Sequence, residues 1–185
     1  ILAEYAKRIE QVATNLSSAG PWTSSLDQVV SLDEVIEKDA GKLARQKDIR
    51  LQIVSGCPGL CVSVNPLVLQ RIMRQLIRNA DQAMVKMPEK KMVITTRPIN
   101  ENTAVEIEVR DFGSGISSLV QSSILSHRTT TKGKGGYGLM FTRQMIESMG
   151  GKIRLSFSEP GQGTAFSIRF PVVENNKSGQ PDMDK

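Results

Sequence analysis

The residues of this chain that are best suited to chemistry lie in a short glycine-rich run. Asp111 follows an alternating apolar segment, and Gly113 and Gly115 come soon after it. A carboxylate at the end of a strand can accept a hydrogen bond from the exocyclic amine of adenine, which guanine does not present in the same place. The glycines let the backbone approach a base without a β-carbon in the way. The run would also suit a tight turn in which Asp111 caps its own backbone.

Two side-chain amides lie one helical turn apart, upstream of this run. The carbonyl oxygen of Asn79 is a neutral, hard ligand suited to Mg²⁺, which would keep waters and take its other ligands from phosphate oxygens. Gln75 lies on the same side of the helix, where its amide can orient a water or a neighbouring ligand but cannot act as a general base. The alternative is that a backbone carbonyl or solvent satisfies Asn79.

A second glycine cluster, with hydroxyl and lysine side chains, lies downstream and just before a helical pattern. Its backbone amides can cradle phosphates at the start of that helix, and Lys132 and Lys134 can screen the charge of a γ-phosphate. The spacing is that of neither a Walker loop nor a Rossmann fingerprint. A plain flexible loop is the alternative. The candidate phosphate-binding residues in this cluster are Thr130, Thr131, Lys132, Gly135, Gly136, Tyr137, Gly138 and Leu139.

The elements that must position these residues follow from the apolar pattern. The clearest is a helix that begins after Asn65, which can cap it, with Pro66 at its first position. Ser31 begins a capping pattern for an earlier helix, and the stretch 113–138 is predicted to be a long, mobile, functional loop. We expect helices at 1–19, 31–46, 66–84 and 139–149, and strands at 51–54, 61–64, 92–97, 104–110, 153–157 and 166–170.

These elements predict an α+β fold. Because hairpins join most of the strands, we expect a two-layer sandwich in which a mixed, mostly antiparallel sheet of about five strands lies under three helices. Glu106 and Glu108 alternate with apolar residues, so one face of this sheet should be solvated or polar. A coiled-coil-like helix at 1–19 would precede the sandwich, and the alternative is an amphipathic helix packed on its own domain.

Length and composition restrict the class of protein. A chain of 185 residues suits one buried domain with an appendage. We place the domain at 21–173, after a helix and linker at 1–20 and before a disordered tail at 174–185. No apolar run approaches the roughly 20 residues that span a bilayer. The chain begins at Ile1 without a visible signal peptide, which predicts a cytoplasmic fragment whose membrane or sensor part would lie outside it.

Charge and cysteine content argue against two further classes. The net charge of +5 comes from scattered Lys and Arg residues, and aromatic residues make up only 4% of the chain, so we expect no nucleic-acid binding. Cys57 and Cys61 lack the two further ligands of a zinc site, and the favoured interpretation is a pair of ordinary reduced thiols.

Four motifs in a fixed order carry a resemblance to a known family. Over residues 31–173 the chain resembles the catalytic and ATP-binding domain of sensor histidine kinases, within the superfamily that includes gyrase, heat-shock chaperone and mismatch-repair ATPases. The segment Leu69 to Ala83 resembles the family's N box, and Asp111 to Gly115 resembles its G1 box. Thr130 to Lys132 resembles the end of the F box, and Gly135 to Leu139 resembles the G2 box. Gly161 to Pro171 is similar to the family's closing strand.

The resemblance implies a role for each part of the candidate site. Asn79 would ligate Mg²⁺, Asp111 would bind the adenine amine, and Thr164 would lie near the adenine. Residues 1–19 would be the end of the second helix of a dimerisation and phosphotransfer domain. The implied partners are ATP, a histidine-bearing dimerisation domain, a response-regulator receiver domain and a second copy of the full-length protein.

Residues 113–138 would form an ATP lid that departs from the family pattern. Gly136 and Gly138 would contact phosphates, as in the family. The expected Phe, however, is missing from the segment 125–129, and the loop at 133–138 is slightly shortened. These differences affect how the lid packs.

Two residues bear on the type of reaction. Gln75 stands where the family commonly has Asn and where the hydrolysing relatives have a glutamate base, which disfavours hydrolysis by that route. His127, the single histidine, lies in the lid, so we expect the acceptor histidine outside this fragment. The prediction is an ATP-dependent protein histidine kinase. The alternatives are a serine kinase of the anti-sigma type, against which the amino-terminal helix argues, and a non-catalytic nucleotide-binding module, against which Asn79 and Asp111 argue.

Overall fold

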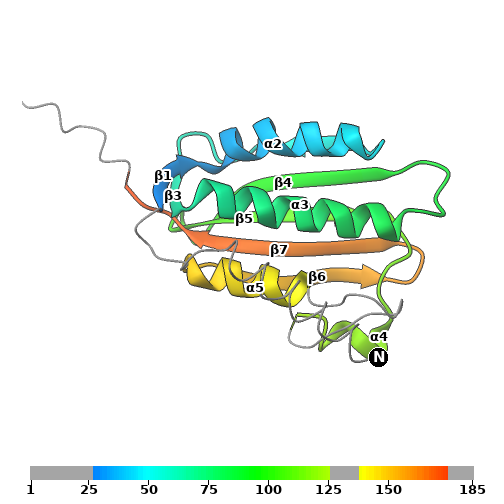
Figure 1. The fold of residues 1–185 in the computed structure, drawn as a ribbon. Helices are drawn as coiled ribbons and strands as arrows, with labels where there is room; N and C mark the ends of the chain where they lie inside the picture. The colour runs from blue at the N-terminus through cyan, green and yellow to red at the C-terminus, as the bar shows by residue number, and fades with distance from the viewer. Residues whose placement is uncertain (1–26, 126–137, 175–185) are drawn as a thin grey trace, which may run out of the picture.

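The computed structural model describes residues 27–125 and 138–174, and this part of the chain forms two layers. The helices α2 (Leu32–Gln46), α3 (Pro66–Ala83) and α5 (Gly138–Ser148) lie side by side in one layer (Figure 1). The arrangement confirms the predicted α+β sandwich with its five-stranded sheet. In spatial order, the strands of that sheet are β2 (Arg50–Val54), β4 (Lys91–Ile99), β5 (Ala104–Asp111), β7 (Gly163–Pro171) and β6 (Lys152–Glu159). The predicted helix at 1–19, residues 126–137 of the predicted loop 113–138 and residues 175–185 of the predicted tail lie outside the described residues.

The sheet is mixed and mostly antiparallel, as predicted. β2 pairs with β4 in parallel, and the other three pairings are antiparallel. In the hairpin between β4 and β5, Asn100, Glu101 and Asn102 have left-handed φ values of 51°, 55° and 67°. In the hairpin between β6 and β7, Gly161 and Gly163 have φ values of 79° and 94°, a conformation that favours glycine. The hairpin places β7 beside β6, and β7 pairs with β5 on its other side.

A second, two-stranded sheet corrects the prediction of a single sheet. β1 (Gln28–Ser31) pairs antiparallel with β3 (Cys61–Val64). The predicted strand 61–64 therefore exists, but it belongs to this small sheet and not to the main one. β1 was not predicted, because four residues without alternation carry no strand signal of their own and the pairing depends on a segment distant in sequence.

The two predicted helix caps have different outcomes. Asn65 caps α3 as predicted, because its Oδ1 accepts hydrogen bonds from the backbone N–H groups of Leu67 at 3.0 Å and Val68 at 3.3 Å. Ser31 does not cap α2 through its side chain, although α2 begins at the next residue. It is the last residue of β1 and lies opposite Cys61 in the ladder, so the strand sets its role.

The predicted loop 113–138 contains a short helix, α4 (Ser118–Gln121). The Nε2 group of Gln121 donates to the backbone carbonyls of Ile116 at 2.8 Å and Ser158 at 3.1 Å. The backbone N–H of Ile116 donates to Oγ of Ser158 at 2.8 Å. The predicted long loop therefore includes one short helix, and these bonds fasten its first part to β6.

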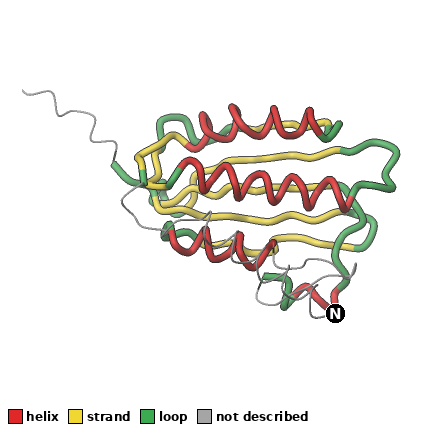
Figure 2. The backbone as a smooth tube through the Cα atoms, viewed as in Figure 1, coloured by secondary structure: helices red, strands yellow, loops and turns green. Residues whose placement is uncertain are grey.

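One hydrophobic cluster fills the space between the layers. α3 contributes its predicted apolar face, and the sheet contributes alternate residues such as Ile94, Ile107 and Ile168, all three of which are 0% exposed. Full burial of such a side chain stabilises the fold by about 1.5–3 kcal/mol. In Figure 2 the helices form one layer over the strands. This packing fixes the position of α3, and with it the amide residues of the candidate site.

The opposite face of the sheet carries a buried carboxylate, Glu106. The Glu106 side chain is 0% exposed and forms ion pairs with the guanidinium groups of Arg97, Arg154 and Arg169. The Nε groups of Arg97 and Arg169 lie 3.0 and 2.7 Å from its carboxylate oxygens. The face is polar, as predicted. Glu106 is shielded from solvent, because arginine side chains from β4, β7 and β6 close over it.

Glu106 gives the fold a specific sensitivity to acid. Burial by itself would raise the pKa of Glu106, but hydrogen bonds from surrounding side chains, those of Arg169 and Arg97 among them, outweigh it and lower the pKa to about 2. A carboxyl pKa that is lower in the folded state stabilises the fold above the ordinary pKa, and this contribution is lost as the pH falls toward the folded value. We expect the protein to lose about 2–3 kcal/mol of unfolding free energy between about pH 5 and about pH 2.

The control is the Glu106→Gln variant, which has no carboxyl group to titrate. It should be less stable at neutral pH, because it leaves three guanidinium groups without their carboxylate. Its remaining stability should lack this acid-dependent loss. Urea unfolding of both proteins across the pH range measures the difference, and the same pH dependence in both would refute the assignment.

Candidate functional site

Asp111 lies at the end of β5, where it faces the start of β7. It pairs with Thr164 across the antiparallel ladder, and it is 7% exposed. Its Oδ1 accepts a hydrogen bond of 2.9 Å from the backbone N–H of Gly113. Burial raises the pKa of Asp111, while the hydrogen bonds from the backbone N–H groups of Gly113 and Thr164 act in the opposite direction. The turn considered as an alternative is therefore present, and it holds the carboxylate in one orientation.

The glycines near Asp111 are explained by close backbone contacts. A β-carbon at Gly113 would lie 2.7 Å from the carbonyl carbon of Ala83, at the end of α3. Gly115 has a φ of 71°, and a β-carbon there would overlap the carbonyl of Glu159 in β6. The glycines therefore let this loop pass between α3 and the β6–β7 hairpin. Contact with a base remains a prediction for both of them.

The amide of Asn79 is oriented by its neighbours on α3. The Nε2 group of Gln75 donates to Oδ1 of Asn79 at 2.8 Å, and an Nη2 group of Arg78 donates to Oε1 of Gln75 at 2.8 Å. Because a guanidinium can only donate, the oxygen of Gln75 must face Arg78, and its nitrogen must then face Asn79. The oxygen of Asn79 is thereby fixed toward Gln75. A carbonyl oxygen with one such bond keeps a second lone pair for a metal ion.

One side of α3 contacts both glycine segments. Gln75, Asn79 and Ala83 follow one another at intervals of four residues, so they share a face of the helix at a rise of about 6 Å each. A β-carbon at Gly138 would overlap Nε2 of Gln75, and a β-carbon at Gly113 would lie 2.8 Å from that of Ala83. Asn79 thus lies between the end of the lid segment and the Asp111 loop. The structure therefore places the start of α5, Asn79 and the Asp111 loop next to one another along one face of α3.

Of the candidate phosphate-binding residues, the structure describes only Gly138 and Leu139, at the start of α5. Gly138 is its first residue, and Oγ1 of Thr142 donates to the carbonyl of Gly138 at 2.8 Å. Leu139 is partly buried against the core cluster. The other candidates of this cluster lie outside the described residues: Thr130, Thr131, Lys132, Gly135, Gly136 and Tyr137.

Three contributors to the site geometry were missed in the sequence. Arg78 lies three residues after Gln75, a helical spacing that could have indicated the contact. Ala83 lies one turn after Asn79, where a small side chain admits the loop at Gly113. Gly163 brings the start of β7 against Asp111, because a β-carbon there would overlap the Asp111 carbonyl. A glycine at the edge of a strand pattern is a signal of such a close approach.

The donor set fits a magnesium ion held by one protein oxygen. Among residues 27–125 and 138–174, no group of three His, Cys, Asp or Glu side chains is placed to hold a metal ion. Asn79 offers a neutral oxygen in a fixed orientation. Mg²⁺ commonly takes only one or two ligands from the protein and the rest from phosphates and water. The residues that are present therefore fit a metal carried with a nucleotide better than a metal held by the protein alone.

The order of the elements, the mixed sheet and the amide-bearing α3 define the fold of histidine kinase ATPase domains. The family described as "Histidine kinase-, DNA gyrase B-, and HSP90-like ATPase" matches residues 64–174, more than half of the chain. The chain belongs to this family.

Similar proteins agree with this assignment. The sensor protein FixL of Bradyrhizobium diazoefficiens is 30% identical over 94% of this chain and 35% of its own length. The sensor histidine kinase ZraS of Escherichia coli is 27% identical over 97% of this chain and 38% of its own length. This chain therefore spans little more than a third of these curated relatives.

Solved structures show the same fold. The catalytic domain of histidine kinase ThkA has a TM-score of 0.65 and 25% identity, with coverage of 78% of this chain and 95% of that domain. Full-length ShkA, solved in complex with AMPPNP, has a TM-score of 0.67 and 21% identity, with coverage of 80% of this chain and 31% of that protein. In the described part of this chain, none of the helices has the length and apolar character needed to cross a membrane.

Proposed function

We propose that this chain is the ATP-binding kinase domain of a two-component sensor histidine kinase. It binds Mg-ATP and presents the γ-phosphate to a histidine outside the chain. The observation that carries this proposal is the line of Gln75, Asn79 and Ala83 along α3. This line contacts the start of α5 at one end and the Asp111 loop at the other. Family membership supports the nature of the ligand.

The adenine end of the proposed site is formed by β5 and β7. Asp111 accepts a hydrogen bond from the adenine amine, and Thr164 lies opposite it in the ladder, next to the base. Gly113 and Gly115 shape the loop that borders this end. The burial of Asp111 strengthens its interaction with a donor, because little water competes for the carboxylate.

The phosphate end lies between α3 and the start of α5. Asn79 holds Mg²⁺ through Oδ1, and the ion supplies charge neutralisation for the β- and γ-phosphates when bound. The backbone N–H groups of Gly138 and Leu139 lie at the first turn of α5, where the helix dipole favours negative charge. We propose that the lid residues Thr130, Thr131, Lys132, Gly135, Gly136 and Tyr137 complete the phosphate contacts.

The chemistry proposed is phosphoryl transfer to nitrogen. The lone pair of a neutral imidazole attacks the γ-phosphorus, the bond to the bridging oxygen breaks, and ADP leaves. The protein contributes position and charge neutralisation, which this reaction needs most. Gln75 orients Asn79 and cannot accept a proton from water, so the site lacks the base that hydrolysis by that route requires.

We extend the proposal to the organisation of the whole protein. Residues 1–20 are the end of the dimerisation and phosphotransfer helix with its linker, residues 21–173 are the catalytic domain, and residues 174–185 are a tail. The partners are a histidine-bearing dimerisation domain, a response-regulator receiver domain and a second copy of the full-length protein, in the cytoplasm. The similarity of the chain to the sensor protein FixL and the sensor histidine kinase ZraS supports this organisation.

A phosphotransfer assay tests the proposal. The chain is mixed with radiolabelled ATP, Mg²⁺ and a separately purified dimerisation domain that carries an acceptor histidine. We expect label on the acceptor that is stable to base and labile to acid, as phosphoramidates are. Acid-stable label would instead favour a serine kinase. Nucleotide binding without transfer to any acceptor domain supplied would favour a non-catalytic module, and either result would overturn the kinase assignment.

A further inference from the structure

The face of the main sheet that points away from the three long helices is strongly basic. The helices all lie over the other face (Figure 1). On this face, side chains at alternate positions come together through the strand register. Seven of the ionisable side chains are basic and three are acidic, a surplus of four positive charges, whereas the whole chain carries +5. We call this set the basic sheet face: Arg50, Lys91, Arg97, Glu106, Glu108, Arg110, Lys152, Arg154, Glu159 and Arg169.

Buried Glu106 organises the centre of the basic sheet face. One carboxylate holds three guanidinium groups, so it neutralises only one of three positive charges. The side chains of Arg97, Arg154 and Arg169 remain 52%, 52% and 44% exposed. A guanidinium has five N–H donors, and only some of these are directed inward at Glu106. The outward donors are therefore held in place by a contact that is itself protected from solvent.

Arg110 extends the same face toward the end of the sheet that carries Asp111. Its guanidinium lies over the rings of Phe112 at 5.2 Å and Phe157 at 4.6 Å from their centroids. The ammonium group of Lys91 lies 5.2 Å from the Phe112 centroid. The Nε of Arg110 is buried and has no hydrogen-bond acceptor among the described residues. These cations cover the aromatic rings, so the rings are not free to stack on nucleic-acid bases.

We propose that the basic sheet face docks an acidic protein surface, with the outward N–H groups of Arg97, Arg154 and Arg169 donating to its carboxylates. Five of the seven basic side chains are arginines, whose planar groups match carboxylates in a fixed geometry. Because Glu106 already orders three of them, less side-chain freedom is lost on binding. The relatives are nearly three times as long as the matched segment, so further domains are available as partners in the same polypeptide.

A membrane surface fits this face less well. Peripheral membrane segments combine lysines with exposed apolar side chains that enter the lipid boundary. The large hydrophobic side chains that are exposed in the described residues are Val29, Val54, Leu67, Val85 and Leu119, and among these only Val54 belongs to the main sheet. It lies on the edge strand β2, beside Thr95 on the same face, and a single half-exposed valine is a small apolar surface for entry into lipid.

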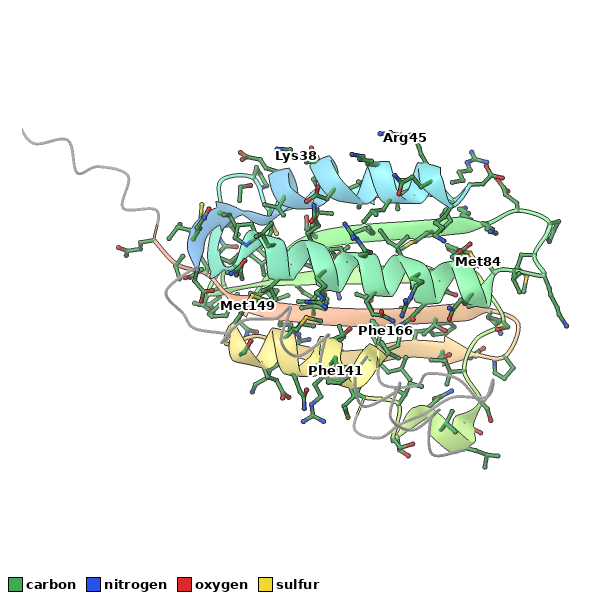
Figure 3. The ribbon with its side chains drawn as sticks, in the orientation of Figure 1. Lys38, Arg45, Met84, Phe141, Met149 and Phe166 are labelled. Atoms are coloured by element: carbon green, nitrogen blue, oxygen red, sulfur yellow. The ribbon has the colours of Figure 1, made fainter. Side chains whose placement is uncertain are left out.

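The test uses charge-neutralised variants with a matched control. The sheet variant carries Lys152→Gln and Arg154→Gln, and the control carries Lys38→Gln and Lys42→Gln on α2. Lys38 is exposed on α2, in the helix layer that covers the other face of the sheet (Figure 3). Both variants lose the same charge. Binding of fluorescent poly-L-glutamate is followed by anisotropy at near-physiological salt, with phosphatidylserine vesicles and duplex DNA as separate arms.

We expect poly-L-glutamate to bind the unmodified chain, and the sheet variant to bind about tenfold more weakly, because two charge contacts are lost. The control should change by less than about twofold. Equal weakening of both variants would show an effect of net charge alone and overturn the proposal. Absence of binding to poly-L-glutamate, or tighter binding to vesicles or DNA, would also overturn it.

A second variant distinguishes weaker binding from a folding defect. Arg154 contacts buried Glu106, so its replacement can destabilise the sheet. Lys152 lies on the same face beside Arg169 in the ladder, and no ion pair with it is seen in the described residues. Lys152→Gln alone, compared with Lys38→Gln alone, should still weaken poly-L-glutamate binding selectively. Thermal unfolding verifies that both proteins are folded, and equal binding by the two would contradict the proposal.

Discussion

Replacement of Asn79 with alanine is expected to abolish the magnesium-dependent part of ATP binding and to lower phosphotransfer by more than about 100-fold. Loss of a hydrogen-bonded neighbour of a metal ligand commonly costs about 10- to 100-fold, and removal of the ligand itself should cost at least as much. The fold should be retained, because Asn79 is only partly buried and alanine is the better helix former. Calorimetric titration with ATP, once with Mg²⁺ and once with EDTA, separates the two contributions.

The Gln75→Glu variant tests the orientation of Asn79 without removing the ligand. A carboxylate cannot donate a hydrogen bond to Oδ1 of Asn79. Arg78 would still donate to position 75, but the side chain there would no longer orient Asn79. We expect Mg-ATP binding to weaken by about tenfold and binding in EDTA to remain close to that of the unmodified chain. If both variants lower binding equally with and without Mg²⁺, Asn79 has a structural role and the metal assignment is wrong.

Asp111→Asn is expected to remove most ATP binding, by about 100-fold, while the protein stays folded. Two backbone N–H groups already donate to the carboxylate, from Gly113 and Thr164. Asparagine offers one acceptor oxygen in place of two, so its amide nitrogen must meet either a backbone donor or the adenine amine. An unpaired donor at a buried site costs about 1–3 kcal/mol, and the lost charge-assisted bond adds to this.

The Asp111→Asn substitution should change the folding stability much less than it changes ATP binding. Burial raises the pKa of Asp111, so the ionised form opposes folding. The protein should therefore lose stability relative to the variant as the pH rises from the ordinary aspartate pKa through the raised folded value. At neutral pH the variant avoids burying a charged carboxylate, and this offsets its lost hydrogen bond. We therefore expect its free energy of unfolding to lie within about 1 kcal/mol of that of the unmodified chain.

Competition between ATP and GTP provides the control for the adenine assignment. Asp111 should favour ATP, because guanine presents a carbonyl oxygen where adenine presents its amine. The Asp111→Asn variant should lose this preference, whereas Asn79→Ala should keep it in EDTA. A variant at position 111 that still prefers ATP as strongly as the unmodified chain would refute the role of the carboxylate.

Much of the fold follows from patterns that act over a few residues. The apolar face of α3 and its Asn65 cap depend on spacing and on a side-chain hydrogen bond to the next turn, so they could be predicted. The alternating strands β5 and β7 were located in the same way. β1 and α4 were missed because their partners, β3 and Ser158, lie far away in the sequence.

The candidate site also has features that the sequence predicts and features that depend on tertiary packing. The residue types and order of Asn79, Asp111 and the later glycine cluster were enough to suggest a nucleotide with Mg²⁺, because carboxylate, amide and glycine each have distinct bonding properties. Their spatial relation could not be read from the chain. It depends on close contacts that link α3 to Gly113 and Gly138, which arise only when the helix packs on the sheet.

Glu106 gives the clearest case of a property set by long-range packing. Its alternation with apolar residues correctly assigned it to the second face of the sheet, which was predicted to be solvated or polar. Burial and a pKa near 2 result from Arg97, Arg154 and Arg169, which reach it from three other strands. Periodicity along one strand specifies the face on which a side chain lies. The neighbours on that face are specified by strand order and register, which depend on the whole fold.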